Sequence, residues 1–346
     1  MAESALTTEE LRQRVARLPR IELAHLPTPL EEVPRFADVV GGPRIFIKRD
    51  DCTGLLYGGN KTRHNEFLMA EALRRGADVV VWGAGVQSNN CRQTAAACAR
   101  LGLECRLVLS RSAHRDEIQG NLLLDYLVGA KVEIVDAEIG PELDEVIIKR
   151  AEELRGKGRI VYSWDRHEGR PLAAVSYLLC LAEIVDEMQE RQLPIDAIYV
   201  SSAGATGAGL TLAKAVLGLA CPVRLICPIK WPWDTRADMA EIANQVASLL
   251  DLPHRLGADD IDATEDYIGP GYGAISEGGM EALDLLARYE GILLDPVYTS
   301  KAMAALIDHV RKRQLKAGQN VVFVHTGGTP AVFAYRDELM EAKKGR

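Results

Sequence analysis

The chain has 346 residues, of which 47% are hydrophobic and 26% charged, and its formal net charge is −8. This composition is typical of a globular protein of roughly two domains. The negative charge argues against a nucleic-acid or anionic-membrane partner, because it leaves no large basic surface. No apolar run approaches membrane-spanning length.

The cysteines and the N-terminus both favour a cytoplasmic protein. There are seven cysteines, an odd number, with no Cys-x-x-Cys pair, a pattern that fits reduced thiols better than disulfides or a zinc site. Residues 1–20 are polar and lack the hydrophobic segment of a secretory signal. No histidine neighbours Cys91, so we expect a small buried residue there rather than a nucleophile.

Strands and helices are predicted to alternate along the chain. The predicted strands cover residues 44–48, 78–82, 104–109, 131–135, 159–162, 197–200, 223–227 and 320–324. The predicted helices cover residues 61–75, 89–101, 118–127, 141–154, 172–189, 206–217, 239–250, 276–289 and 301–313. This alternation predicts an α/β fold with parallel sheets flanked by helices. We expect two interleaved domains, a large cofactor-binding domain of residues 1–62 and 171–346 and a small inserted α/β domain of residues 63–170.

In such sheets ligands gather beyond the carboxyl ends of the strands, so the loops that follow strands are informative. The first of them, Gly58-Gly59-Asn60-Lys61, opens a helix. Partial burial at such a turn lowers the pKa of an amine, and a neutral amine is a nucleophile toward carbonyls. Our hypothesis is that Lys61 forms a Schiff base with pyridoxal phosphate. The alternative is a surface lysine after a turn.

Two further strand-to-helix loops suit anions. In residues 83–90, Ser88, Asn89 or Asn90 can cap the helix, and the free amides of its first turn suit a substrate carboxylate. Residues 201–209 are small, so their backbone can close around a phosphate. They lack the lysine of a P-loop and the spacing of the dinucleotide fingerprint, which favours a phosphate without a nucleoside. The alternatives are an ordinary helix cap and tight helix packing, respectively.

The C-terminal part supplies hydroxyl groups. Tyr272 lies between glycines, Tyr298 precedes a helix, and Thr326 follows the last strand. Such hydroxyls can handle protons or contact a ring. No cluster of histidines and carboxylates has metal-ligand spacing. Two anion-binding loops and a lysine, with no nucleotide or metal motif, therefore indicate pyridoxal 5'-phosphate.

These residues, in this order, resemble the D-cysteine desulfhydrase and 1-aminocyclopropane-1-carboxylate deaminase family, to which L-cysteate sulfo-lyase is also similar. The resemblance covers about residues 18–335. It is carried by Lys48-Arg49-Asp50-Asp51, Gly58-Gly59-Asn60-Lys61-Thr62-Arg63, Gln87-Ser88-Asn89, Arg92-Gln93-Thr94, Gly271-Tyr272-Gly273, Asp295-Pro296-Val297-Tyr298 and His325-Thr326-Gly327-Gly328. It implies the tryptophan-synthase-β-like fold (fold type II of the pyridoxal phosphate enzymes) and a homodimer.

The resemblance also implies roles for individual residues. Lys61 would carry the Schiff base, Asn89 would meet the cofactor's phenolic oxygen, and Ser88 would face the substrate carboxylate. The remaining cofactor contacts would come from Asn60, His64, Ala203, Gly204, Ala205, Thr206, Thr299 and Thr326. Tyr272 and Tyr298 would line the reacting side of the substrate, and Asn89 and Asn90 would also contact the substrate.

Position 299 separates the reactions of this family. The deaminases carry a glutamate here, which can hydrogen-bond a protonated pyridine nitrogen, whereas this chain has Thr299. A hydroxyl from Thr299 or Thr326 stabilises a pyridinium less well, so the ring is a weaker electron sink. This favours expulsion of a good β-leaving group over the opening of a cyclopropane.

Three other departures concern the cofactor phosphate and the substrate. His64 stands where the family often has a second lysine that reaches the phosphate, and Asn90 stands where the desulfhydrases usually have histidine. Residues 162–168 replace a small, flexible substrate-side loop. Trp164, Arg166 or His167 could line a reshaped pocket there, with Arg166 or His167 meeting an anionic group; a drifted surface loop is the alternative.

The sequence therefore predicts a cytoplasmic pyridoxal phosphate lyase that releases pyruvate and ammonia from a small amino acid with a β-leaving group. D-cysteine is the first expected substrate and L-cysteate the second. Lys61 would remove the Cα proton, or Ser88 would do so for the opposite stereochemistry. The alternatives are a 1-aminocyclopropane-1-carboxylate deaminase, a β-replacement synthase and a catalytically silent amino-acid-binding homologue.

Overall fold

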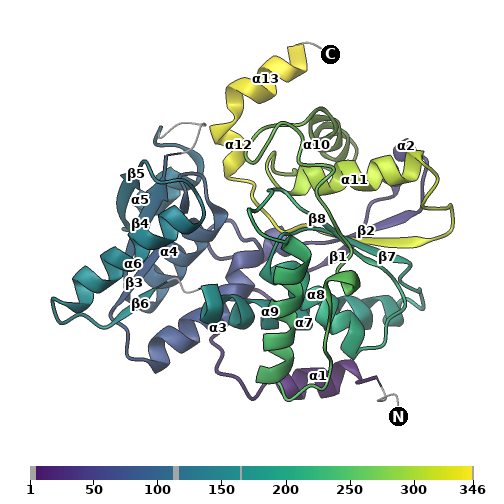
Figure 1. Cartoon of the computed structure of the whole chain (residues 1–346). Coiled ribbons are helices and arrows are strands. Elements are labelled where there is room, and N and C mark those ends of the chain that lie inside the picture. Colours follow the sequence, from purple (N-terminus) through teal and green to yellow (C-terminus); the bar gives the residue numbers. More distant parts are fainter. Residues whose placement is uncertain (1–4, 112–116, 164–165, 345–346) are drawn as a thin grey trace.

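The computed structural model describes residues 5–111, 117–163 and 166–344, which form two sheets with helices around and between them (Figure 1). The side chains of residues 166 and 167 lie outside this description. The larger sheet and its helices occupy the right and lower parts of Figure 1, and the smaller sheet lies at the left. The predicted α/β fold is thereby confirmed.

The larger sheet has the strand order β1-β2-β10-β7-β8-β9. All neighbouring strands are parallel except β1 and β2. The central strands are rich in buried β-branched residues, as expected for a sheet that is covered on both faces. The strands are β1 (Leu30–Glu32), β2 (Arg44–Lys48), β7 (Ala197–Ser201), β8 (Val223–Ile226), β9 (Ala263–Thr264) and β10 (Asn320–Val324). The short edge strands β1 and β9 were not predicted, because two or three residues show no periodicity.

The smaller sheet has the order β5-β4-β3-β6, and all its pairs are parallel. Its strands are β3 (Val79–Gly85), β4 (Glu104–Ser110), β5 (Lys131–Val135) and β6 (Val161–Ser163). Every strand of this sheet lies in the sequence between β2 and β7 of the larger sheet. The domain boundaries at residues 62/63 and 170/171 remain a prediction.

The helices cover both faces of each sheet. Helices α1, α7, α8 and α9 pack on one face of the larger sheet, and α2, α10 and α11 pack on the other. Helices α3, α4 and α5 cover one face of the smaller sheet, and α6 covers the other. The helices are α1 (Thr8–Val15), α2 (Pro34–Val40), α3 (Asn60–Arg74), α4 (Asn89–Leu101), α5 (Gly120–Leu127), α6 (Pro141–Arg155), α7 (Arg166–Glu190), α8 (Ala205–Val216), α9 (Thr235–Leu249), α10 (Glu277–Glu290), α11 (Thr299–Arg311), α12 (Ala331–Ala334) and α13 (Arg336–Lys344). None of the helices in the described ranges is both long and apolar enough to cross a membrane.

The start of α7 corrects one prediction. The sequence predicted a helix over residues 172–189, which starts directly after Pro171. The helix instead begins at Arg166 and contains Pro171. The last part of the stretch predicted as a loop, residues 162–168, is therefore helical.

Close backbone contacts hold the loop before α3. Gly58 and Gly59 have φ angles of +61° and +124°. A Cβ atom on Gly58 would lie 2.2 Å from the carbonyl oxygen of Asp51, and a Cβ on Gly327 would lie 2.7 Å from the Cα of Gly59. Both contacts require glycine, and the second brings the loop after β10 against the start of α3. The Asn60 amide donates to the carbonyl of Thr326 across this contact, at 3.0 Å.

A buried ionic network lies beneath the same helix. The guanidinium of Arg63 is 1% exposed and donates to both carboxylate oxygens of Asp50, at 2.9 and 3.0 Å, and to both of Glu183, at 2.7 Å each. Lys48, on β2, lies 3.0 Å from Glu183 and 2.6 Å from Glu187. Tyr177, on α7, donates to Asp50 at 2.6 Å. The network thereby joins α3 to the larger sheet and to α7.

Substitution of Arg63 with methionine should lower the free energy of unfolding by about 3–5 kcal/mol, because Asp50 would remain buried without its cation and Glu183 would keep only Lys48. Arg74→Met on the same helix is the matched control, since Arg74 pairs with Glu71 at the surface, and its loss should be much smaller. Urea denaturation of the two variants measures the difference. Equal losses for the two variants would contradict the structural role of the network.

Candidate active site

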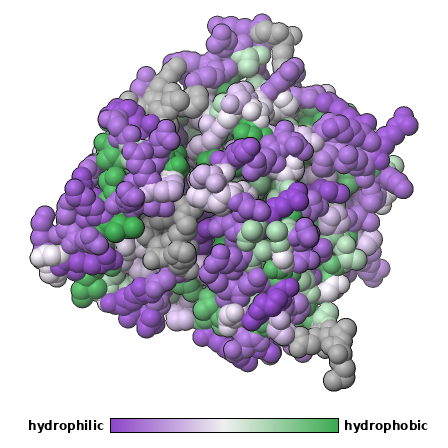
Figure 2. Space-filling view, viewed as in Figure 1, coloured by the Kyte–Doolittle hydropathy of each residue, from purple (hydrophilic) through white to green (hydrophobic). Residues whose placement is uncertain are grey.

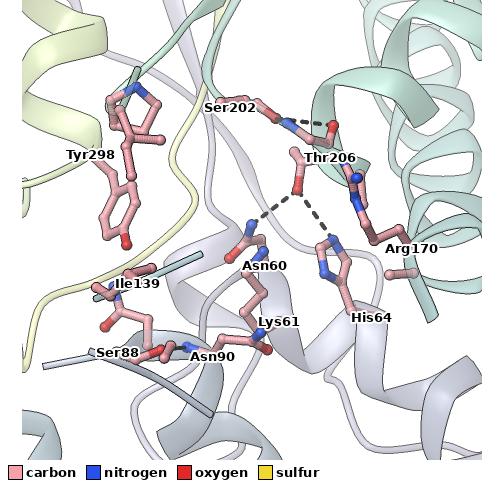
Figure 3. A pocket seen from close by; sticks show the side chains of 18 of the residues that line it. Asn60, Lys61, His64, Ser88, Asn90, Ile139, Arg170, Ser202, Thr206 and Tyr298 are labelled. Carbon is pink, nitrogen blue, oxygen red and sulfur yellow. Dashed lines mark hydrogen bonds between the residues drawn. The ribbon is translucent and has the colours of Figure 1, made fainter. Parts of the chain in front are cut away.

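A cavity of about 270 Å³ lies between the two sheets, and residues from both sheets line it (Figure 3). Ser88, Ile139 and Tyr298 lie on one side of Lys61, and Ser202, Thr206 and Arg170 lie on the other. The lining residues are Asn60, Lys61, His64, Leu68, Trp82, Gly83, Ala84, Ser88, Asn89, Asn90, Ile139, Gly140, Leu143, Asp144, Arg170, Ala173, Ser201, Ser202, Ala203, Gly204, Ala205, Thr206, Pro228, Ile229, Trp231, Tyr272, Tyr298 and Thr326.

Lys61 is the second residue of α3 and extends into the cavity (Figure 3). The residue is partly buried, and this burial alone lowers the pKa of its amine to about 8. A larger fraction of the amine is therefore neutral near pH 7 than for an exposed lysine. This agrees with the predicted depression of the Lys61 pKa and leaves a nucleophilic amine at the cavity.

Ser88 caps helix α4 at the edge of the cavity. Its hydroxyl oxygen accepts hydrogen bonds from the amides of Asn90 and Cys91, at 3.1 and 3.2 Å. The hydroxyl proton remains available to a ligand, and the start of α4 favours a negative charge. Cys91 is buried, as predicted, and burial raises the pKa of its thiol. It is therefore poorly suited to act as a thiolate nucleophile.

Asn89 has a defined amide orientation. Its Oδ1 accepts a hydrogen bond from Nδ2 of Asn121 at 2.9 Å, and Asn121 in turn accepts one from Nε of Arg92 at 2.8 Å. The Nδ2 group of Asn89 is thereby left as a donor for the cavity. A donor at this position suits a phenolate oxygen, which is the predicted partner of Asn89.

The loop between β7 and α8 provides free backbone donors. Ser202 accepts a hydrogen bond from the Gly207 amide at 2.8 Å, whereas the amides of Ala203, Ala205 and Thr206 have no backbone or side-chain acceptor in the described residues. These amides and the N-terminus of α8 suit a phosphate.

Thr206 connects this loop to α3. Its Oγ1 accepts a hydrogen bond from Asn60 at 3.0 Å and lies 3.2 Å from Nε2 of His64 (Figure 3). The His64 ring also packs edge-on against Tyr177, with ring centroids 5.6 Å apart. Burial, together with the charges of Lys61 and Arg63, holds the pKa of His64 well below its ordinary value, so this side chain is neutral.

Tyr272 and Tyr298 form a pair on the opposite side of the cavity. Their hydroxyl oxygens lie 2.6 Å apart, and their rings pack edge to face. Burial raises the pKa of both tyrosines, and their shared hydrogen bond lowers that of Tyr272 while it raises that of Tyr298. Either hydroxyl can donate to the other, so the pair can pass a proton along a short path.

The structure distinguishes the two threonines predicted to meet the ring nitrogen. Thr326 lines the cavity, whereas Thr299 does not. Thr299 is fully buried, and its hydroxyl donates to Asp295 at 2.7 Å. The same carboxylate accepts hydrogen bonds from the amides of residues 297–299. Asp295 therefore holds the start of α11, and Thr326 supplies the hydroxyl at the cavity.

The substrate-side stretch around α7 is described only in part. Trp164 lies outside the described residues. Arg166 and His167 form the first turn of α7, and nothing is described of their side chains. Their proposed contacts with the substrate therefore remain predictions. Asn90 lines the cavity, as predicted.

Two lining residues were not predicted to act in the site. Arg170 forms a two-point ion pair with Asp238, in which Nη1 lies 2.8 Å from Oδ1. Trp231 donates from Nε1 to the carbonyl oxygen of Ala203 at 3.3 Å and stacks on Trp233. The sequence around Arg170 did not indicate a role in the site, because its partner Asp238 is 68 residues away along the chain.

The residues of the cavity fit pyridoxal 5'-phosphate. An amine of lowered pKa, an oriented amide donor and a loop of free amides are the groups that its aldehyde, phenolic oxygen and phosphate require. In the part of the chain that the structure covers, no group of three or more histidines, cysteines or carboxylates could hold a metal ion. Lys61, Asn89 and residues 203–206 would hold the cofactor.

Comparison with known proteins gives the same assignment. The family model for pyridoxal-phosphate dependent enzymes matches residues 21–327. A D-cysteine desulfhydrase of Klebsiella pneumoniae (strain 342) is 40% identical over 334 residues, which cover 94% of this chain and 99% of the relative. The crystal structure of an ACC deaminase homologue is 33% identical, with a TM-score of 0.87 over 96% of this chain and 98% of that one.

A more distant structure shares the fold alone. Apo diaminopropionate ammonia lyase of Escherichia coli is 16% identical, with a TM-score of 0.66 over 98% of this chain and 92% of that one. The near-complete match to the family model and the high identity to the Klebsiella protein decide the assignment. The chain belongs to the family of pyridoxal-phosphate dependent enzymes.

Proposed function

We propose that this protein is a D-cysteine desulfhydrase. It takes D-cysteine and water to pyruvate, ammonia and hydrogen sulfide. The Cα–H and Cβ–S bonds break, sulfur leaves as sulfide, and water releases the amino group as ammonia. The 40% identity to a D-cysteine desulfhydrase over nearly the full length of both chains supports this substrate.

The bound cofactor supplies an electron sink for the pair left when the Cα proton is removed. Lys61 is the base for this proton, since a pKa of about 8 is close to the working pH. Ser88 is a poorer base, because its oxygen already accepts two amide hydrogen bonds. Its proton instead holds the substrate carboxylate at the start of α4.

The leaving sulfur requires a proton on the side of the cavity opposite the phosphate loop. Tyr298 and Tyr272 lie on that side, 2.6 Å apart between their hydroxyl oxygens. Tyr298 protonates the departing sulfide, and Tyr272 replaces the proton through their shared hydrogen bond. Ile139 lies beside Tyr298 at the cavity wall (Figure 3), and its apolar side chain limits the entry of water to the reacting centre.

A hydroxyl in place of a carboxylate favours elimination over ring opening. Thr326 borders the cavity, whereas the carboxylate of Asp295 lies outside its lining and is engaged by Thr299 and three amides. The ring nitrogen would therefore lack a carboxylate partner, so it would stabilise a carbanion less strongly. A good β-leaving group tolerates this weaker stabilisation, whereas a cyclopropane does not.

The enzyme acts as a cytoplasmic homodimer. The seven cysteines are free, and six of them are buried, which suits a reducing compartment.

Exposed apolar side chains on and beside α5, such as Leu127 (70% exposed) and Ile118 (62%), adjoin α12 with its exposed Phe333. In Figure 2, hydrophobic residues gather on the part of the visible surface that belongs to the smaller sheet and its helices. A second copy suits this patch, and sedimentation of the purified protein tests the dimer.

A screen for pyruvate release tests the reaction and the substrate. The substrates are both enantiomers of cysteine, 3-chloroalanine, cysteate and serine, together with 1-aminocyclopropane-1-carboxylate, for which 2-oxobutyrate is measured. D-cysteine should give the highest kcat/KM. A preference for L-cysteate would make the protein a sulfo-lyase, and turnover of the cyclopropane would refute the role assigned to Thr326.

Tyr298→Phe should lower kcat for D-cysteine on the order of 100-fold, because proton transfer to the leaving group is lost. The same variant should lose much less activity with 3-chloroalanine, since chloride leaves without a proton. Tyr289→Phe, on the distant helix α10, is the matched control. Equal losses with the two substrates would mean that Tyr298 positions the substrate rather than protonating the sulfur.

The lowered pKa of Lys61 predicts the pH dependence of cofactor capture. The neutral amine reacts, and about one tenth of it is neutral at pH 7 when the pKa is about 8. The rate at which apoenzyme gains the visible absorbance of lysine-bound cofactor should therefore rise with pH and level off above about 8. Lys61→Ala should show no such absorbance. A rate that still rises through pH 10 would place Lys61 in an ordinary solvated environment.

A further inference from the structure

The phosphate of the cofactor requires a positive partner in this cavity. A phosphate monoester carries about −1.5 to −2 charges at pH 7, and a buried charge is costly unless it is paired. The resemblance to the desulfhydrase family implies a second lysine three residues after Lys61, but this chain has His64 there. The neutral His64 ring, which lies against Thr206 and Tyr177, cannot supply the charge.

Arg170 lies beside the phosphate loop. It stands on α7, lines the cavity together with residues 203–206, and is 9% exposed. A Cβ atom placed on Gly204, the residue that caps α8, would lie 3.7 Å from Nη2 of Arg170. Figure 3 shows Arg170 on the same side of the cavity as Ser202 and Thr206, away from Tyr298.

The ion pair with Asp238 leaves Arg170 free to bind a second anion. The two carboxylate oxygens of Asp238 are met by Nη1 and Nη2, and a guanidinium has five N–H donors in all. The remaining donors can reach an anion at the loop. Because Asp238 belongs to α9, the pair also holds the guanidinium in one orientation between two helices. Among the described side chains that line the cavity, Arg170 and Lys61 are the only lysine or arginine residues.

We propose that Arg170 binds the cofactor phosphate and replaces the second lysine that this chain lacks. The phosphate is held by the amides of residues 203–206 and by a planar guanidinium, which binds phosphate oxygens through two parallel hydrogen bonds. The positive charge at the phosphate then comes from α7 rather than from position 64 on α3.

Cofactor affinity measured with and without the phosphate group tests this role. Apoenzyme is titrated with pyridoxal 5'-phosphate and with pyridoxal, which lacks the phosphate, and the Kd values are read from cofactor absorbance. Arg170→Gln should raise the Kd for pyridoxal 5'-phosphate about 10- to 100-fold, the effect of losing a charge-assisted hydrogen bond. The Kd for pyridoxal should change less than about twofold.

Two further variants serve as controls. Arg170→Lys keeps the charge and should recover most of the phosphate-dependent affinity. Arg170→Met, which also removes the charge, replaces Arg170→Gln if the latter fails to fold. Arg224→Gln removes an arginine that pairs with Asp262 on the outer part of the larger sheet, and it should leave both Kd values unchanged. Thermal unfolding of each apoenzyme shows whether the variant is folded.

Three outcomes would overturn the proposal. Equal weakening of both cofactor forms would mean that Arg170 only supports the cavity wall through Asp238. Unchanged Kd values for both forms would mean that the phosphate is held without it. A raised KM for D-cysteine at unchanged cofactor affinity would assign Arg170 to the substrate. The two cofactor affinities do not depend on whether D-cysteine is the substrate, because their measurement needs no turnover.

Discussion

The position of Lys61 depends on the buried ionic network around Arg63, two residues further along α3. Arg63 is bound by both oxygens of Asp50 and of Glu183, and Lys48 completes the pairing. Charges this deeply buried are tolerated only when they are paired, so the network admits very few positions of α3 relative to the larger sheet. The close backbone contacts of Gly58 and Gly327 also restrict the position of the first turn of α3.

The network also explains why the reactive amine lies where the two sheets meet. Helix α3 begins against the loop after β10 of the larger sheet and then packs against α4 and the smaller sheet. Its first turn therefore faces both parts of the molecule. Ser88 and Asn89 line the cavity from one part, and Thr206 and Tyr298 line it from the other.

Local signals made much of this site predictable from the sequence. The bounds of β2, β5, β10 and α4 agree with the sequence, because buried β-branched runs, caps and glycines act within a few residues. The same holds for the loops that carry Lys61, Ser88 and Thr206. Long-range contacts were not predictable. Arg170 is defined by Asp238 on another helix and by Gly204 on another loop, and the choice of Thr326 over Thr299 depends on the fully engaged Asp295.

The cavity has to bind a phosphate and also to keep the pKa of Lys61 low. In this chain different residues meet these two requirements, whereas in a site with two neighbouring lysines they would depend on the same groups. Burial alone lowers the pKa of Lys61, and no neighbouring cation contributes to the shift. A second ammonium group one turn along α3 would lie beside Lys61, whereas the guanidinium of Arg170 comes from α7 and is paired with Asp238. His64 contacts Thr206 but is neutral, so it adds no positive charge to the cavity. With the proposed roles, such a site would bind a phosphate dianion through Arg170 while desolvation alone lowers the pKa of Lys61, because a different residue is responsible for each effect.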